Sequence, residues 1–407
     1  MGDLKPKVLL VEDSKSLRNF ISQQLTLIGC NVTSTESVAE TQDVLAKDTE
    51  FSCAVLDYCL PDGEHGEVID LVLEKKLKVV IMTSYFTPES REHFLSKGAL
   101  EYIIKDSMSS VSYLIPFVKR LINNVNHHAL VVDDSISMRT HIRMMLNNQY
   151  IKTTEAVDGQ DALDKLAKNP DISFMITDNA MPNKNGVEMI REVRQIYDQN
   201  TLAILGLSGS SELNITAQFL KAGANDFLHK PFHHEEFQCR VHQMLNMKEA
   251  TDELYMMANQ DSLTGLWNRR YLFAREVGLP SQRNVAMIDI DFFKKVNDQH
   301  GHEGGDQVLI TISNLINQCF PEGTVVRFGG EEFLIMQHGE FDSFSERLDN
   351  MREQISKTEI NYNSQTIQVT ISIGAATCRD DLDQQIKAAD DLLYRAKSEG
   401  RNRLCTV

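Results

Sequence analysis

Residues 8–13 read Val-Leu-Leu-Val-Glu-Asp, and residues 130–135 read Leu-Val-Val-Asp-Asp-Ser. Both stretches are runs of branched aliphatic side chains, which are typical of a buried strand, and both lead into two acidic residues. A later Asp-x-x-x-Pro motif follows at the same offset of 44 residues in each case, from Asp13 to Asp57 and from Asp134 to Asp178. The sequence therefore predicts one domain that is present twice.

Each copy alternates short β-rich runs with amphipathic stretches of helical spacing. In the first copy we predict strands near 8–11, 53–56, 79–82 and 101–104. This alternation is typical of a doubly wound α/β domain, whose functional residues gather at the carboxyl ends of the strands. We expect one site per copy, formed by Glu12, Asp13, Asp57, Thr83 and Lys105 in the first and by Asp133, Asp134, Asp178, Ser208 and Lys230 in the second.

The acids of each predicted site suggest phosphoryl chemistry. Three carboxylates at close range need a divalent cation, and hard oxygen ligands suit Mg²⁺. The candidate ligands are Glu12, Asp13 and Asp57 in one copy and Asp133, Asp134 and Asp178 in the other. A carboxylate beside the metal can act as nucleophile toward a phosphoryl group, and we assign this role to Asp57 and Asp178. The neighbouring hydroxyl and lysine would then bind the new phosphate oxygens.

With these residues in place, both copies resemble response-regulator receiver domains. The resemblance implies that Asp57 and Asp178 are phospho-acceptors, and that a sensor histidine kinase or phosphotransfer protein is a partner. Tyr102 and Phe227 match the aromatic switch position of the family. The alternative is a duplicated α/β domain with incidental surface acids. One departure is that Asp106 follows Lys105, whereas Pro231 follows Lys230 as is usual in the family.

A second informative stretch is Arg-Phe-Gly-Gly-Glu-Glu-Phe at residues 327–333. It lies between two apolar runs, so Gly329-Gly330 is predicted to be the tip of a β-hairpin, where a phosphate could approach closely. Taken alone, an exposed charged hairpin would explain it. However, an apolar strand at 285–291 also ends in acids, and we expect Asp289 on that strand and Glu331 on the hairpin to bind Mg²⁺.

These blocks together resemble the GGDEF domain of diguanylate cyclases. Further matches are Asp261 to Arg270 at the start of the domain and Ala389 to Asn402 near its end. The resemblance implies that the carbonyl of Ile290 is a third metal ligand, and that Asp289, Lys294, Glu331 and Glu332 are catalytic. It also implies GTP-binding roles for Phe292, Phe293, Lys294, Asn297, Asp306, Gly330, Lys397 and Arg401.

Each of these GTP contacts has its own expected chemistry. The turn Phe292-Phe293-Lys294 would cradle the triphosphate. Lys397 and Arg401, expected one helical turn apart, would grip the same phosphates. Asn297 and Asp306 would recognise guanine, because a buried carboxylate accepts from donors that adenine lacks. The strand expected over 368–373 receives no chemical role.

Length, charge and cysteine usage bound the remaining possibilities. We predict a first receiver at 5–124, a second receiver at 127–247, a helical linker at 248–258 and a cyclase domain at 259–407. The linker is expected to be the last part of one continuous helix over 235–258. The fold class is therefore α/β, with two doubly wound, flavodoxin-like receivers followed by an α+β GGDEF domain. A net charge of −17 argues against nucleic-acid binding, and no apolar run predicts membrane insertion. Seven scattered cysteines suit the cytoplasm, and 123–128 is expected to be a solvated linker, in which two histidines could instead suggest a metal.

The overall organisation is similar to that of PleD-type response regulators. It implies a phosphorylation-regulated homodimer that condenses two GTP into cyclic di-GMP and two pyrophosphates. The alternatives are a non-catalytic scaffold that binds GTP or cyclic di-GMP, and a transcription factor, for which we find no helix-turn-helix segment. The general base could be either Glu331 or Glu332. Phe320 and Gly323 replace the Arg-x-x-Asp of many relatives, so we expect no strong product inhibition there.

Overall fold

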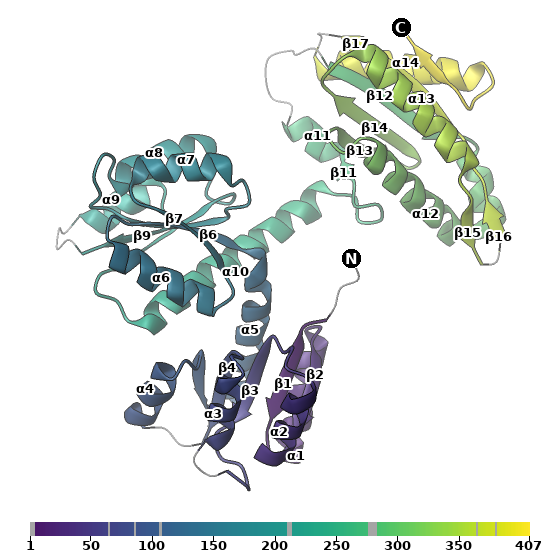
Figure 1. Ribbon diagram of the computed structural model, residues 1–407. Coiled ribbons are helices and arrows are strands. Elements are labelled where there is room, and N and C mark those ends of the chain that lie inside the picture. Colours follow the sequence, from purple (N-terminus) through teal and green to yellow (C-terminus); the bar gives the residue numbers. More distant parts are fainter. Residues whose placement is uncertain are drawn as a thin grey trace. The chain divides into compact units, whose positions relative to one another are not determined.

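The computed structural model describes residues 5–63, 66–84, 87–105, 108–209, 214–275, 283–363, 365–378 and 381–407. The chain divides into two compact units, Met1–Ala250 and Thr251–Val407 (Figure 1). In the described part of the chain, no helix combines the length and the apolar character needed to cross a bilayer.

The first unit begins with a five-stranded parallel sheet in the order β2-β1-β3-β4-β5. Its strands are β1 (Lys7–Val11), β2 (Asn31–Thr35), β3 (Cys53–Asp57), β4 (Val79–Thr83) and β5 (Glu101–Ile104). Its helices are α1 (Lys15–Leu27), α2 (Val38–Lys47), α3 (Glu67–Glu74), α4 (Pro88–Ser96) and α5 (Met108–Asn123). Successive strand residues face opposite sides, so Leu10 packs with α1 and α5 while Leu9 packs with α2, α3 and α4.

A second parallel sheet repeats this topology, in the order β10-β9-β8-β6-β7. Its strands are β6 (His128–Val132), β7 (Lys152–Ala156), β8 (Phe174–Asp178), β9 (Ala203–Ser208) and β10 (Asp226–His229). The helices are α6 (Ile136–Asn148), α7 (Gly159–Lys168), α8 (Gly186–Ile196), α9 (Ile215–Ala222) and α10 (His234–Asn259), and the short 3₁₀ helix η1 (Asn124–Asn126) precedes β6. Helices α6 and α10 cover one face and α7, α8 and α9 the other (Figure 1). The predicted duplicated, doubly wound architecture is confirmed.

Two features of these domains were missed from the sequence. The strand β2, Asn-Val-Thr-Ser-Thr, was not predicted because it is a polar edge strand with little burial. The segment 123–128 is not a solvated linker, because Asn124, His127 and His128 are all buried. The ring of His128 lies 2.8 Å from both Asp171 and Thr154. His128 is also the first residue of β6.

The joint between the two receivers centres on Glu249 of α10. Its carboxylate accepts hydrogen bonds from Arg120 of α5 at 2.5 Å, from Asn123 at 3.3 Å and from the ring of His127 at 2.8 Å. Burial alone would raise the pKa of Glu249, but these donors outweigh it and lower the pKa to about 2. The first receiver and the end of the second are therefore joined by a partly buried, charge-assisted contact.

The second unit is built on a mixed six-stranded sheet in the order β11-β13-β14-β12-β17-β18, with a separate hairpin of β15 and β16. Its strands are β11 (Trp267–Asn268), β12 (Arg283–Ile290), β13 (Thr324–Gly329), β14 (Glu332–Gln337), β15 (Ile360–Tyr362), β16 (Gln365–Ile367), β17 (Ile371–Cys378) and β18 (Leu404–Thr406). Its helices are α11 (Arg269–Arg275), α12 (Phe293–Cys319), α13 (Phe341–Lys357) and α14 (Leu382–Ser398). The strand expected over 368–373 starts only at Ile371.

Helix α14 lies directly on β17 at Gly374. A methyl group at this glycine would come 2.1 Å from the backbone nitrogen of Leu393 and 2.2 Å from the carbonyl oxygen of Ala389, both on α14. Real Cβ atoms do not approach backbone atoms so closely. The small residue at position 374 therefore sets the distance between α14, which carries Lys397, and the sheet that carries Asp289.

We predict that Gly374→Ala destabilises the second unit by about 1–3 kcal/mol, because the added methyl group forces α14 away from the sheet. Trp267 is the only tryptophan in the chain and lies in this unit, so its fluorescence in urea follows the unfolding of this unit within the full chain. Gly323→Ala is the control, since a methyl group there meets no atom closer than 3.5 Å. Equal unfolding midpoints for the two variants would contradict the prediction.

Candidate functional site

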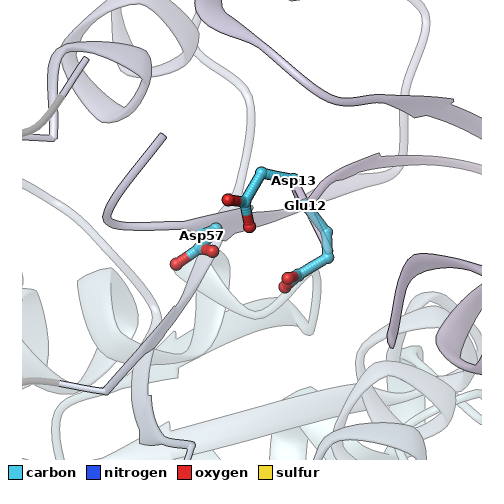
Figure 2. A group of neighbouring side chains, drawn as sticks. All are labelled: Glu12, Asp13 and Asp57. Carbon is cyan, nitrogen blue, oxygen red and sulfur yellow. The ribbon is translucent and has the colours of Figure 1, made fainter. Parts of the chain in front are cut away.

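The acids of the first receiver come together at the carboxyl ends of β1 and β3. Glu12 and Asp13 follow β1, and Asp57 is the last residue of β3 (Figure 2). Ligand oxygens of the three side chains lie within 4.8 Å of one another, which is found for no other set of three potential ligands in the residues that the structure describes. This cluster has the donor set that Mg²⁺ prefers.

Lys105 neutralises part of this cluster. Its ammonium lies 2.6 Å from Glu12 and 2.6 Å from Asp57. Burial raises the pKa of Glu12, and the contact with Lys105 opposes that effect. The lysine therefore holds the site together through the same carboxylates that a metal ion or a phosphoryl group would approach.

The second receiver repeats the lysine contact. Lys230 lies 2.6 Å from Asp133 and 2.8 Å from Asp178. Burial works against the charge of the lysine, but hydrogen bonds to the two aspartates outweigh it and raise the pKa of Lys230. Asp134 is exposed beside them. The ligand atoms of Asp133, Asp134 and Asp178 do not meet the close spacing of the first cluster.

The predicted switch residues lie at the ends of the next strands. Thr83 ends β4 and Ser208 ends β9, and both are buried. Tyr102 and Phe227 are also buried, and the hydroxyl of Tyr102 lies 3.3 Å from that of Ser90. The peptide bond between Lys230 and Pro231 is cis, whereas Asp106, which follows Lys105, lies outside the described residues.

In the second unit, the acidic end of β12 lies against the hairpin tip between β13 and β14. The register places Asp289 opposite Glu332, and the backbone N–H of Ile290 donates to the carbonyl of Glu331 at 3.3 Å. Burial raises the pKa of Asp289, and the charges of Glu331 and Glu332 act in the same direction. The structure thus brings together the residues predicted to bind the metal.

Lys397 of α14 provides the opposing charge. Its ammonium lies 2.8 Å from the carboxylate of Asp289. This contact opposes the effect of burial but does not outweigh it, so the pKa of Asp289 remains raised. The sequence predicted a phosphate contact for Lys397, and the structure gives it a carboxylate partner. Asp289 is near the end of β12, so Lys397 lies at the candidate site whether it contacts a phosphate or this carboxylate.

The donors at this site fit Mg²⁺. Asp289, Glu331 and the carbonyl end of β12 at Ile290 offer hard oxygen atoms, and burial, together with the nearby charges of Glu331 and Glu332, raises the pKa of Asp289. Asp289, Ile290 and Glu331 would hold the ion. Glu332 lies on the adjacent strand position and could contact it or a substrate hydroxyl.

The predicted phosphate turn occupies the start of α12. Phe292 has a left-handed backbone (φ 57°), and α12 begins at Phe293, so the first turn of the helix, including the exposed Lys294, follows closely after β12. Unpaired N–H groups at a helix N-terminus favour anions. The ring of Phe292 is exposed and has the Lys295 ammonium 4.5 Å and the Arg401 guanidinium 4.6 Å from its centre.

The sequence had suggested that Arg401 lies on the same helix as Lys397, but the structure shows that it does not. α14 ends at Ser398, and the chain then turns through Gly400, Arg401 and Asn402, all with positive φ. A four-residue spacing could not distinguish a continuing helix from this turn. The guanidinium still reaches the start of α12, through Phe292.

The predicted guanine pair lies on the two halves of α12. The helix is interrupted at Gly301 (φ 73°, ψ 173°), with Asn297 before the break and Asp306 after it. A methyl group at Gly305 would lie 1.9 Å from the amide oxygen of Asn297. The Asn297 side chain therefore contacts the helix at Gly305, the residue before Asp306. Asp306 is exposed, which corrects the expectation of a buried carboxylate.

No role was predicted for Arg327 from the sequence. Its guanidinium donates two hydrogen bonds to the carbonyl of Gly330, at 3.1 and 2.9 Å, and one to Asp261 at 2.9 Å. Burial raises the pKa of Asp261, but Arg327 and Thr264 outweigh it and lower the pKa. Arg327 therefore braces the hairpin tip, and its place just before the two glycines was the available signal.

Phe320, which stands where many relatives have the arginine of Arg-x-x-Asp, is part of the hydrophobic core. Phe320 is fully buried, packs edge-on against Phe344 and has the guanidinium of Arg347 4.6 Å from its ring centre. Pro321 to Gly323 form the turn between α12 and β13. No side chain at position 320 is therefore presented to a ligand.

Comparison with known proteins agrees with this architecture. The family described as "Response regulator receiver domain" matches residues 8–111 and 129–242, which is more than half of the chain. The family described as "Diguanylate cyclase, GGDEF domain" matches residues 258–403. The chain therefore belongs to the response regulator family, and its second unit carries a GGDEF domain of the diguanylate cyclase class.

Individual proteins are similar to all or part of this chain. Response regulator PleD of Caulobacter vibrioides is 27% identical over 302 residues, covering 69% of this chain and 66% of that protein. Diguanylate cyclase DgcM of Escherichia coli is 33% identical over 177 residues, covering 41% of this chain and 42% of that protein. A solved structure described as a "probable two-component system response regulator/GGDEF domain protein" is 36% identical, with a TM-score of 0.57, and covers 60% of this chain and 100% of that chain. The chain thus spans slightly less than two thirds of the first curated relative.

We predict that Lys397→Met strengthens the binding of a divalent cation to the nucleotide-free protein, because it removes the ammonium that lies 2.8 Å from Asp289. Titration with Mn²⁺ followed by electron paramagnetic resonance measures the affinity. Lys387→Met, an exposed position on the same helix, is the matched control and should bind like the wild type. Equal Mn²⁺ affinity in both variants would contradict the prediction. Each of the two variants is made separately in an Asp57→Asn, Asp178→Asn background, so that Mn²⁺ binding at the receivers does not affect the comparison.

Proposed function

We propose that this chain is a diguanylate cyclase that condenses two GTP into cyclic di-GMP and two pyrophosphates, under the control of receiver phosphorylation. The observation that carries this proposal is the junction of β12, the hairpin tip and the first turn of α12. There Asp289 lies close to Glu331 of the hairpin tip, and the strand that carries Asp289 leads through Phe292 into α12. Metal-binding carboxylates next to an anion-binding helix start suit a nucleoside triphosphate.

The reaction balances as a phosphoryl transfer. The 3′-hydroxyl of each GTP attacks the α-phosphorus of the other, so that two new P–O bonds form, the two bonds to the pyrophosphate oxygens break, and two pyrophosphates leave. The hydroxyl proton passes to a carboxylate, Glu331 or Glu332. Mg²⁺ held by Asp289, Ile290 and Glu331 supplies charge stabilisation on the phosphates when bound.

The remaining residues bind and orient the nucleotide. The first turn of α12, with Lys294, holds phosphate oxygens, and Arg401 and Lys397 add positive charge from the other side. Lys397 exchanges Asp289 for a phosphate when the substrate enters. Asn297 and Asp306 select guanine, and the approach at Gly330 leaves room for the substrate because it has no side chain.

The proposed enzyme works as a homodimer, because each site holds one GTP and the reaction joins two. Helix α10 supports this part of the proposal. Met247, Ala250, Leu254 and Met257 follow the alternating three- and four-residue spacing of a coiled-coil seam, and all four are exposed. Pairing of this seam with a second copy would bring two GGDEF domains together.

The receivers complete the proposal as the regulatory part. Phosphorylation of Asp57 or Asp178 by a histidine kinase or phosphotransfer protein, with Mg²⁺ at each site, would favour the dimer. We place this chemistry in the cytoplasm, since the thiols of Cys30, Cys53, Cys239, Cys319 and Cys405 form no disulfide.

Incubation with GTP and Mg²⁺, with identification of the product by mass spectrometry, tests the activity. We predict that Glu331→Gln lowers kcat by a factor on the order of 10²–10³, as expected for the loss of one preorganised charged group. Glu322→Gln, at an exposed position of the same unit, is the control and should retain the wild-type rate. Wild-type turnover in Glu331→Gln at saturating Mg²⁺ would remove Glu331 from the site, and GTP binding without any product in the wild type would favour the scaffold function.

We further predict that beryllofluoride, a phosphoryl mimic, raises the cyclase rate most at low protein concentration. At high concentration, mass action already supplies the dimer, so the activation shrinks. Rates measured against concentration in wild type, Asp57→Asn and Asp178→Asn will assign the response to one receiver or to both. A wild-type response in each single variant and in the double variant would show that neither aspartate gates the enzyme.

A further inference from the structure

Asp291 is a buried carboxylate beside the site that the proposed mechanism does not use. Its side chain is fully shielded from solvent. One oxygen accepts from the hydroxyl of Ser372 at 2.7 Å, and the other accepts from the hydroxyl of Thr370 at 2.7 Å and from the backbone N–H of Asn402 at 3.0 Å. Burying a carboxylate costs free energy unless hydrogen-bond donors compensate for the lost water. These three donors compensate Asp291, and the carboxylate in turn holds Ser372, Thr370 and Asn402 in place.

The bond to Asn402 fixes a strained turn. Arg401 and Asn402 have φ values of 64° and 44°, in the left-handed region, which is unfavourable for a residue with a side chain. The turn is held from the other side by Arg352, whose guanidinium donates to the side-chain oxygen of Asn402 at 2.9 Å. Asp291 and Arg352 therefore clamp Asn402 between them.

The clamped turn presents Arg401 to the start of α12. The Arg401 guanidinium lies 4.6 Å from the ring centre of Phe292, and its Nε is 4.0 Å from the Asp291 carboxylate. Phe292 directly follows Asp291 in the chain and has its own positive φ. Asp291 thus joins both sides of the anion-binding turn: through its own backbone it leads into α12, and through its side chain it holds the turn that carries Arg401.

We propose that Asp291 is a positioning residue for the triphosphate, acting through Arg401 and without contact to the metal or the nucleotide. This inference rests on the proposed function, since it takes the ligand to be a guanosine triphosphate. Loss of the acceptor leaves the Asn402 N–H without a partner, the left-handed turn relaxes, and Arg401 leaves its place over Phe292. The conservative amide can keep the geometry, because Asn at 291 can still accept from Asn402 and donate to Ser372.

Calorimetry with a GTP analogue that has a methylene group between the α- and β-phosphates tests this in the full chain. We expect Asp291→Ala to weaken binding by about 10- to 100-fold, as for loss of one charge-assisted hydrogen bond, and Asp291→Asn to bind within a few-fold of the wild type. The double variant Asp291→Ala, Arg401→Ala should bind no more weakly than Arg401→Ala alone, because the two residues act as one unit. Asp342→Ala, an exposed aspartate on α13, is the control.

The outcomes separate this inference from the proposed function. Wild-type affinity in Asp291→Ala, or a loss that adds fully to that of Arg401→Ala, overturns the positioning role. Weak binding in Asp291→Asn equal to that of Asp291→Ala also overturns it. Trp267 fluorescence in urea identifies a variant that fails to fold, in which case the cycle with Asp291→Asn and Arg401→Ala decides. Binding without cyclic di-GMP formation in the wild type rejects the cyclase function and leaves the positioning role standing, whereas no binding in the wild type rejects both.

Discussion

Repulsion between carboxylates is the constraint on which the sites of this protein depend. Each of the three sites places acids at the end of a strand, and each is balanced by one lysine from late in its domain: Lys105, Lys230 and Lys397, at 2.6–2.8 Å from their partners. An ammonium on a flexible stem can hold such a cluster together and can also move aside for a metal ion or a phosphate. The same electrostatic arrangement thus occurs on three sheets of two different topologies.

Much of the architecture could be predicted because its signals are local and repeated. The apolar strands, the equal offsets to Asp57 and Asp178, and the glycine tip at Gly330 all lie within short stretches whose pattern has one simple structural interpretation. The confirmed fold class follows from these patterns, together with the family resemblance. Strand β2 escaped because an edge strand buries little and so need not be apolar.

The errors concern residues whose environment is set by distant parts of the chain. His127 looked solvated, but it is buried by contacts with Ser173 and Glu249, which nothing near position 127 announces. Arg401 looked helical, although the turn that carries it depends on Asp291, 110 residues earlier in the sequence. Asp306 was expected to be buried because its proposed role requires a ligand around it, and the protein alone leaves it exposed.

The contacts of Glu249 also bear on how modular the two receivers are. A chain trimmed to begin at residue 127 would keep Glu249 and His127 but lose Arg120 and Asn123, which supply the other donors to that carboxylate. The last helix of the second receiver would then carry a partly buried charge whose strongest partner has been deleted. The two domains are similar, but this contact joins the last helix of the second to the last helix of the first, so removing either domain also removes a contact of the other.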